Sequence, residues 1–259
     1  MATGRLPDEG PARLGPVTLP AGRLITGYPG MDHVAWVTAD PVPDSGRIWA
    51  ALSELHPRTG LVPIQVDGSP GHVRDPLNLA ETEDPRGADG LDAGTLLEEM
   101  WRDGQPDEAD PGWIEMRAPF IRGFPGLAPP EHTPLTPAER QHAVDVVTQE
   151  ARIGLIAADR PADVLPVIGW GALVNRGESL LALTAILRSW EERFGARLIA
   201  VGDADLGLFV ERPPRTLQAA QRIAAEQAVL ADECIDGATG ISSIAERLVN
   251  SPTWTLWWD

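Results

Sequence analysis

The sequence predicts an α+β protein, a mixed sheet with flanking helices that forms a single compact unit with a recognisable C-terminal domain. Strand-like runs and longer runs of helical periodicity occur in both halves of the chain, and 43% of the 259 residues are hydrophobic, enough for a large core. We divide the chain into residues 1–22, an extended or disordered lead-in rich in Pro and Gly, 23–150, an N-terminal α/β region, and 151–259, the C-terminal domain.

The first elements after the lead-in alternate between strand and helix. Strands are expected at about residues 23–26 and 34–38, followed by a helix over 45–56 that Pro57 stops, and then by a strand over 61–66.

Much of the net charge of −17 belongs to one acidic segment, residues 81–115, whose 12 acidic side chains and two arginines give it a charge of −10. Within it, Thr95 and Glu98 form a capping box that predicts one helix. The segment is either a solvated acidic loop or a surface for a basic partner. Because such a surface repels phosphates, we expect neither nucleic-acid binding nor contact with an anionic membrane.

Residues 104–134 are dense in Pro and Gly but carry Trp113, Phe120 and Phe124. Aromatic side chains at this density favour an ordered segment that wraps the protein, with the aromatics as its anchors, over a free linker.

The remaining elements are marked by caps and periodicity. Thr136, Pro137 and Glu139 mark a helix start. After it we expect strands over 153–157, 198–201 and 206–211, helices over 179–194, 217–231 and 244–250, the last capped by Ser243 with Glu246, and a final strand rich in tryptophan.

Composition excludes several chemistries. All 21 basic residues are arginine, so lysine-dependent phosphate loops, Schiff bases and kinase sites are impossible. The single cysteine, Cys234, excludes an internal disulfide and a zinc site with several thiolates.

Metal, cofactor and membrane signatures are also missing from the sequence. The five histidines show no metal-ligand spacing, and Asp203-Ala204-Asp205 is better explained as a hairpin turn than as a pair of metal ligands. We therefore expect no metal and no cofactor. No apolar run is long enough to span a bilayer and no signal-peptide pattern occurs at the start, so we expect a cytoplasmic protein.

Three tryptophans lie among the last six residues, in Trp254-Thr255-Leu256-Trp257-Trp258-Asp259. Such a terminus is docked in the protein, because each tryptophan hides roughly 150–250 Å² when packed. Strand alternation places Trp254, Leu256 and Trp258 on the core face. Trp257 then belongs either to a core on the other face or to a pocket, and the two carboxylates of Asp259 could pair with Arg212 or Arg215.

Four stretches carry a family resemblance: Ser189-Trp190-Glu191-Glu192-Arg193-Phe194-Gly195, Glu211-Arg212-Pro213-Pro214-Arg215-Thr216, Ala224-Ala225-Glu226 and the terminal tryptophan run. In order and spacing, about residues 150–259 resemble the bacterial family catalogued as domain of unknown function 4253. The resemblance implies a fold unit and a bacterial origin, but no established activity. The family pattern usually continues with a histidine and a Cys-Pro-Asp run, where this chain has Gln227 and Ala231-Asp232-Glu233, so no histidine or thiolate role is carried over.

The strongest candidate site is the start of the helix predicted over 217–231. Arg212 and Arg215 precede Thr216 there, and cations at a helix N-terminus are disfavoured by about 0.3–1 kcal/mol. Either a bound carboxylate or phosphate offsets them, held by arginine forks and helix amides, or acids such as Glu211 or Asp205 do so.

Three functions remain open. The first is a cytoplasmic binding or regulatory protein that neutralises a protein partner or senses a ligand. The second is an enzyme for a small anionic substrate, with Arg212, Arg215, Thr216 and Trp257 binding it and Glu226 or Asp259 as acid or base. The third is a structural assembly role. The partner is accordingly an unknown protein or a small anionic ligand.

Overall fold

The computed structural model describes residues 4–28, 32–66, 77–104, 111–147, 150–176, 179–231 and 240–258. His72, Cys234 and Asp259, which were considered above, lie outside the described residues, as does part of the acidic segment.

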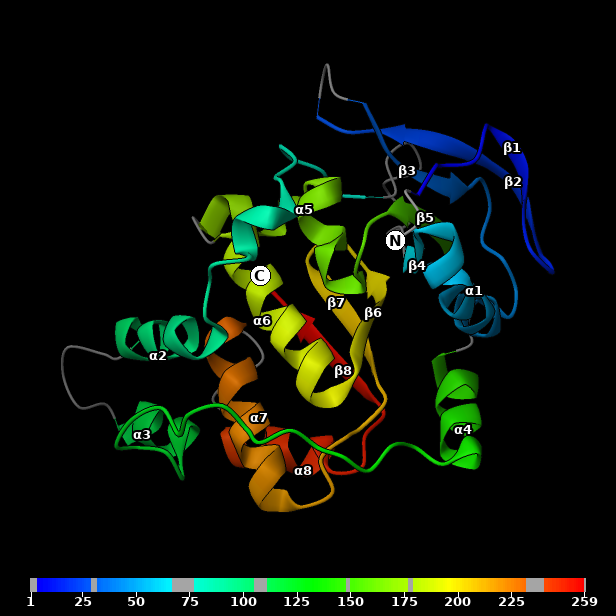
Figure 1. Cartoon of the computed structure of the whole chain (residues 1–259). Helices are drawn as coiled ribbons and strands as arrows, with labels where there is room; N and C mark the ends of the chain where they lie inside the picture. The colour runs from blue at the N-terminus through cyan, green and yellow to red at the C-terminus, as the bar shows by residue number, and fades with distance from the viewer. Residues whose placement is uncertain are drawn as a thin grey trace.

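A single mixed sheet of eight strands runs through the described chain (Figure 1). The strands are β1 (Gly10–Leu14), β2 (Val17–Thr26), β3 (His33–Thr38), β4 (Leu61–Val66), β5 (Arg152–Ala157), β6 (Ala196–Val201), β7 (Asp205–Val210) and β8 (Thr253–Trp257). Their order is β1-β2-β3-β5-β4-β6-β7-β8, and only β4 and β6 pair in parallel. The structure thus confirms the predicted α+β class with a mixed sheet.

Strand β5 joins the two halves of the sequence. It belongs to residues 151–259, yet it pairs antiparallel with both β3 and β4 of the N-terminal region. The N-terminal region and the C-terminal domain therefore share one sheet.

Helices cover both faces of this sheet. The α-helices are α1 (Ser45–Thr59), α2 (Ala93–Asp103), α3 (Pro111–Arg117), α4 (Pro137–Val147), α5 (Val164–Ile168), α6 (Leu180–Phe194), α7 (Leu217–Leu230) and α8 (Ile241–Leu248), with short 3₁₀ turns η1 (Pro85–Ala88), η2 (Pro161–Asp163) and η3 (Gly171–Arg176). In Figure 1, α6 and α7 lie over the β6–β8 part of the sheet, whereas α1 and α4 lie at the right. The apolar side chains of α5, α6 and α7 join the main core, and those of α1 and α4 join two smaller clusters.

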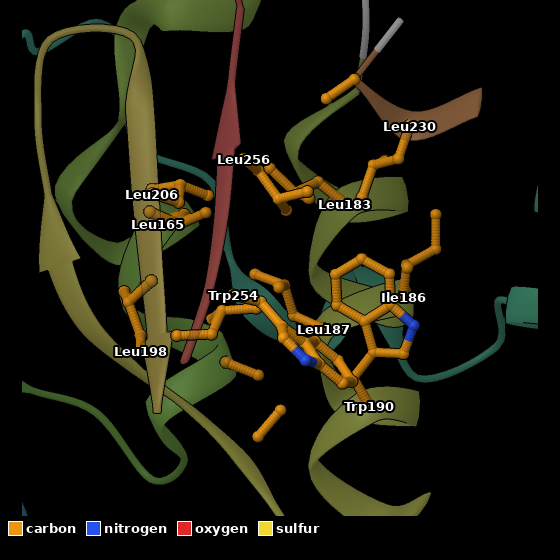
Figure 2. Packing of buried hydrophobic residues seen from close by; sticks show 14 of the residues in the cluster. Leu165, Leu183, Ile186, Leu187, Trp190, Leu198, Leu206, Leu230, Trp254 and Leu256 are labelled. Atoms are coloured by element: carbon orange, nitrogen blue, oxygen red, sulfur yellow. The ribbon is translucent and has the colours of Figure 1, made fainter. Parts of the chain in front are cut away.

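The main core is centred on the terminal strand. Trp254 packs edge-on against Trp190 and Phe194 of α6, with ring centroids 5.7 and 5.5 Å apart (Figure 2). Trp254, Leu256 and Trp258 are all buried, as strand alternation predicts. β8 is nevertheless an edge strand, and Trp257 on its other face is 43% exposed. A core position for Trp257 is therefore wrong.

From residue 10 onward the lead-in is ordered, contrary to the alternative of disorder. Residues 10–22 form β1 and most of β2, joined by a two-residue turn whose Gly15 has φ +57°. Ala12, Leu14 and Leu19 point into a core cluster with Trp36. Cross-strand burial therefore outweighs the irregular Pro and Gly content.

Several helix ends differ from expectation by a few residues. α1 continues through Pro57 to Thr59, and Gly60, which has φ +66°, forms its C-cap. Asp92, not Thr95, caps α2, by accepting a hydrogen bond from the Thr95 N–H at 2.8 Å. α8 begins at Ile241 after Gly240 rather than at a Ser243 cap.

Two predicted anchoring devices are present. In α4, the Thr136 N–H donates to Glu139 at 2.7 Å and the Glu139 N–H donates to Thr136 Oγ1 at 3.2 Å, which confirms the capping box. In the wrapping segment, Phe120 and Phe124 pack against the main core, and the Trp113 indole donates to the Gly104 carbonyl at 3.1 Å.

Candidate functional site

A cleft of about 670 Å³ opens between α1, α4 and the β6–β7 hairpin, on the side of the sheet away from the main core. Trp49 and Phe209 lie side by side in its lining, with ring centroids 5.4 Å apart. Leu135 and Val144 add apolar surface. The volume falls within the roughly 300–1,000 Å³ typical of small-molecule sites.

The cleft exists because one face of the sheet is only partly covered. Leu135, Val144 and Phe209 belong to a small cluster under α4 that also contains Trp49 and Ile199. Among the described helices, α1 and α4 supply the apolar side chains of the clusters on this face. Two helices leave a gap over β6 and β7, and this gap is the cleft.

Three arginines line the cleft, and two of them are neutralised by the protein. Arg47 donates to Asp145 at 2.9 Å and, by this hydrogen bond above all, lowers the pKa of Asp145. Arg140 is paired with Glu211, which is 9% exposed. These two arginines hold α4 against α1 and against the end of β7.

Arg197 of β6 is different, because its guanidinium forms no hydrogen bond or ion pair within the part of the chain that the structure describes. It is half-buried and lies opposite Phe209 in the β6–β7 register. An unpaired guanidinium beside an apolar surface is a binding group for an anion, because its planar fork matches carboxylate and phosphate oxygens.

A second cavity of about 210 Å³ shares Trp49, Ser53 and Arg197 with the cleft and continues it toward α6. Glu191 of α6 lines this inner part. Burial raises the pKa of Glu191, against the opposing effect of Arg160, whose Nε lies 2.9 Å from the carboxylate. The Trp49 indole N–H is buried and has no acceptor among the described residues.

The arginines predicted to bind an anion before α7 have protein partners. Arg212 donates to the Glu192 carbonyl at 2.9 Å, and Arg215 donates to Glu139 and to Asn250, both at 3.1 Å. Hydrogen bonds from the backbone and side chain of Thr136, and then from Arg215, lower the pKa of Glu139 to about 2. An anion-binding role for these arginines stays a prediction.

Thr216 performs the capping role that its position suggests. Its side chain accepts a hydrogen bond from the Ala219 N–H at 3.2 Å and so caps α7. Glu226 lies ten residues further along this helix, about 15 Å away. The structure therefore does not bring Glu226 to the arginine pair, and Asp259 lies outside the described residues.

Glu226 is instead the centre of a buried polar cluster. It is fully buried, and Arg193 donates to its two oxygens at 2.8 and 2.6 Å. The Trp190 indole and the Ala128 backbone N–H each add a hydrogen bond of 2.7 Å. Both oxygens are thus occupied, and the cluster ties α6 and α7 to the wrapping segment at Ala128.

The stretches that carry the family resemblance meet around this cluster. Trp190 contacts both Glu226 and Trp254, and the Arg212 N–H donates to the Phe194 carbonyl at 2.8 Å. Motif residues far apart in sequence therefore build one centre in the fold.

Residues 152–259 match the family model described as domain of unknown function (DUF4253). This confirms the resemblance over the C-terminal part of the chain. Comparison with curated proteins and with solved structures finds no match. The match accordingly identifies a fold unit and assigns no activity to it.

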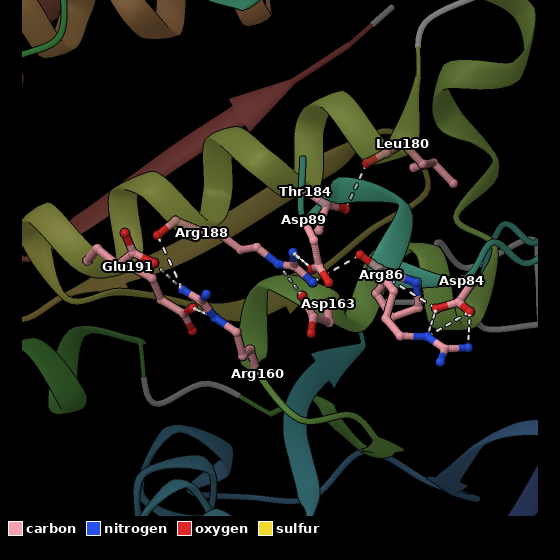
Figure 3. Close-up of polar contacts among 11 residues, drawn as sticks. Asp84, Arg86, Asp89, Arg160, Asp163, Leu180, Thr184, Arg188 and Glu191 are labelled. Carbon is pink, nitrogen blue, oxygen red and sulfur yellow. Dashed lines mark hydrogen bonds and ion pairs between the residues drawn. The ribbon is translucent and has the colours of Figure 1, made fainter. Parts of the chain in front are cut away.

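A charged network joins the DUF4253 region to the acidic segment (Figure 3). Arg188 of α6 donates to Asp163 at 2.7 Å and to Asp89 at 2.8 Å, and it also reaches the Pro85 carbonyl at 3.0 Å. At least this part of the acidic segment is docked on the protein rather than a free loop.

None of the helices among the described residues is long and apolar enough to cross a membrane. No group of three or more His, Cys, Asp or Glu side chains among these residues is placed to hold a metal ion.

Sequence reasoning missed the cleft. Its lining comes from α1, the segment before α4, α4 itself and two strands, and no motif links these pieces. The one available signal was Arg197, a charged residue in an apolar strand, which alternates with the buried Ala196 and Leu198.

Proposed function

We propose that this chain is a cytoplasmic binding protein for a small amphipathic anion, which it holds in the cleft between α1, α4 and the β6–β7 hairpin. The observation that carries the proposal is Arg197, unpaired within the described residues and set in the wall of an apolar cleft. The anion would accept hydrogen bonds from Arg197, and the apolar part of the ligand would lie on Trp49 and Phe209. The single cysteine, which excludes an internal disulfide, accords with a cytoplasmic location.

Two observations favour a small ligand over a protein partner, and binding over catalysis. Asp89 of the acidic segment is engaged by Arg188 within the chain, which leaves less of this segment for a basic protein partner. Glu226, the expected acid or base, is buried with both oxygens accepting structural hydrogen bonds, whereas a catalytic group must reach its substrate.

The test is thermal unfolding of the full chain against a panel of small carboxylates, phosphates and nucleotides. At 100 times its dissociation constant a ligand adds about 2.7 kcal/mol, which raises the midpoint by roughly 5–10 °C for a chain of this size. We expect Arg197→Gln to abolish the shift. Arg58→Gln, an exposed arginine of α1 outside the cleft lining, should leave it unchanged.

The double variant Arg212→Ala with Arg215→Ala separates the two anion sites. If the shift survives in Arg197→Gln but is lost in the double variant, the ligand binds before α7 and the cleft is not the site. If no compound in the panel shifts the midpoint, the small-ligand function is wrong.

A further inference from the structure

The lining of the cleft contains one unpaired cation and one unpaired anion. Arg197 and Glu54 both line the cleft, and neither side chain forms a hydrogen bond or an ion pair within the described part of the chain. The other two cleft arginines are neutralised by Asp145 and Glu211, as described above. The charge left for a ligand is therefore one positive and one negative group.

These two groups come from different walls. Glu54 belongs to the stripe of α1 that also presents Arg47, Ala50 and Ala51 to the cleft, at positions i, i+3, i+4 and i+7 of one helical face. Arg197 comes from β6 across the cleft. Among the described residues no ion pair joins Glu54 to Arg197, so both charges remain available to a ligand in the cleft.

Resting on the function proposed above, we infer that the ligand is a zwitterion with an apolar body, of the class of α-amino acids with an aromatic or branched aliphatic side chain. Its carboxylate pairs with the guanidinium of Arg197, and its ammonium pairs with Glu54. Its side chain lies against Trp49 and Phe209 and extends toward the smaller cavity that Trp49 and Arg197 also line.

Charge complementarity disfavours the competing ligand, a phosphate dianion. It would place two negative charges beside one available cation and bring them near Glu54, in a chain whose net charge is already −17. Like charges brought together in this way lower affinity.

The experiment compares probes of matched shape by calorimetric titration of the full chain. L-Phenylalanine carries both charges, 3-phenylpropionate only the anion and 2-phenylethylamine only the cation; inorganic phosphate is the fourth probe. We expect L-phenylalanine to bind about tenfold more tightly than 3-phenylpropionate, the effect of one added hydrogen-bonded charge. Glu54→Gln should remove this advantage by weakening L-phenylalanine binding without weakening 3-phenylpropionate binding, and Arg197→Gln should weaken both.

The two proposals fail in different ways. If 3-phenylpropionate binds as tightly as L-phenylalanine, or if Glu54→Gln leaves L-phenylalanine binding unchanged, the zwitterion inference is overturned while an Arg197-dependent anion site stands. If phosphate binds most tightly, the ligand class is wrong. If none of the four probes binds, both the inference and the proposed function are overturned. Melting curves of the two variants verify that each is folded.

Discussion

The substitution Glu226→Gln tests whether the motif cluster stabilises the fold. Glutamine keeps the size of the side chain but removes its charge, and it places an NH₂ group where Arg193 or Trp190 now donates. Arg193 then remains as a cation whose side chain is only 11% exposed, without its carboxylate. The change therefore isolates the ion pair without opening a cavity.

The magnitude follows from the burial of both partners. Removing one member of a buried ion pair costs about 3–5 kcal/mol, because the other charge is left uncompensated. Since 1 kcal/mol shifts the midpoint temperature of thermal unfolding by roughly 2–4 °C in a chain of this size, that temperature should fall by about 6–20 °C. The control is Glu192→Gln, which removes the ion-pair partner 3.1 Å from Arg160, because the Glu192 side chain is 68% exposed and such pairs contribute about 0–1 kcal/mol.

The assays are thermal unfolding for the fall in midpoint temperature and urea unfolding for the free energy, both followed by far-ultraviolet circular dichroism, with the denaturant slope monitored so that a change in urea midpoint reports stability. A third variant, Glu226→Gln with Arg193→Met, removes both charges and should recover part of the loss, because an apolar pair avoids the unpaired cation. If Glu226→Gln unfolds within 1 kcal/mol of the wild type at an unchanged slope, the cluster does not hold the fold and the reasoning is refuted.

Thr136→Ala removes the α4 capping box and should lower stability by about 1 kcal/mol and speed amide exchange in α4; unchanged exchange would contradict the role of the cap. Burial raises the pKa of Glu191, so the protonated Glu191 side chain contributes to the free energy of unfolding. This contribution is full below pH 4.5, the ordinary pKa of the side chain, and is lost as pH rises through the raised pKa. The stability of Glu191→Gln relative to wild type should therefore rise as pH increases above 4.5 in urea titrations, and a difference that stays constant with pH would oppose this. Trp254→Ala should cost about 3–5 kcal/mol, whereas the exposed Trp257→Ala should cost under about 1, and equal losses on calorimetry would refute the assigned faces of β8.

Much of the fold was predictable because local signals and tertiary structure agree. The strands, the Ser179 cap and Gly195 stop of α6, and the capping box of α4 are determined by residues within one or two turns. The β1–β2 hairpin was missed because its strands are stabilised by packing on Trp36, which lies outside the local window. The short α5 likewise gave no clear period, since nearly all of its residues are buried.

The candidate site was less predictable than the fold. Arg212 and Arg215 stood out in sequence because they precede a helix, but the residues that engage them, Glu192, Glu139 and Asn250, come from other elements. Arg197 did not stand out in the sequence. It is notable only in the fold, where its side chain lies beside a cavity and has no partner among the described residues. Both properties depend on strand order and register, which the pattern of one chain does not determine.

The residues that carry the family match and the residues that line the proposed site lie on opposite sides of the sheet. The motif residues of the DUF4253 region meet at Glu226 on one side of the sheet, where they join α6, α7 and β8. The cleft lies on the other side, and eleven of its thirteen lining residues, including Trp49 and Glu54, precede residue 152. Residues 152–259 alone would also expose both edges of β5, which normally pair with β3 and β4. The family match therefore describes the fold around Glu226, whereas the cleft is built mostly from residues that the match does not cover.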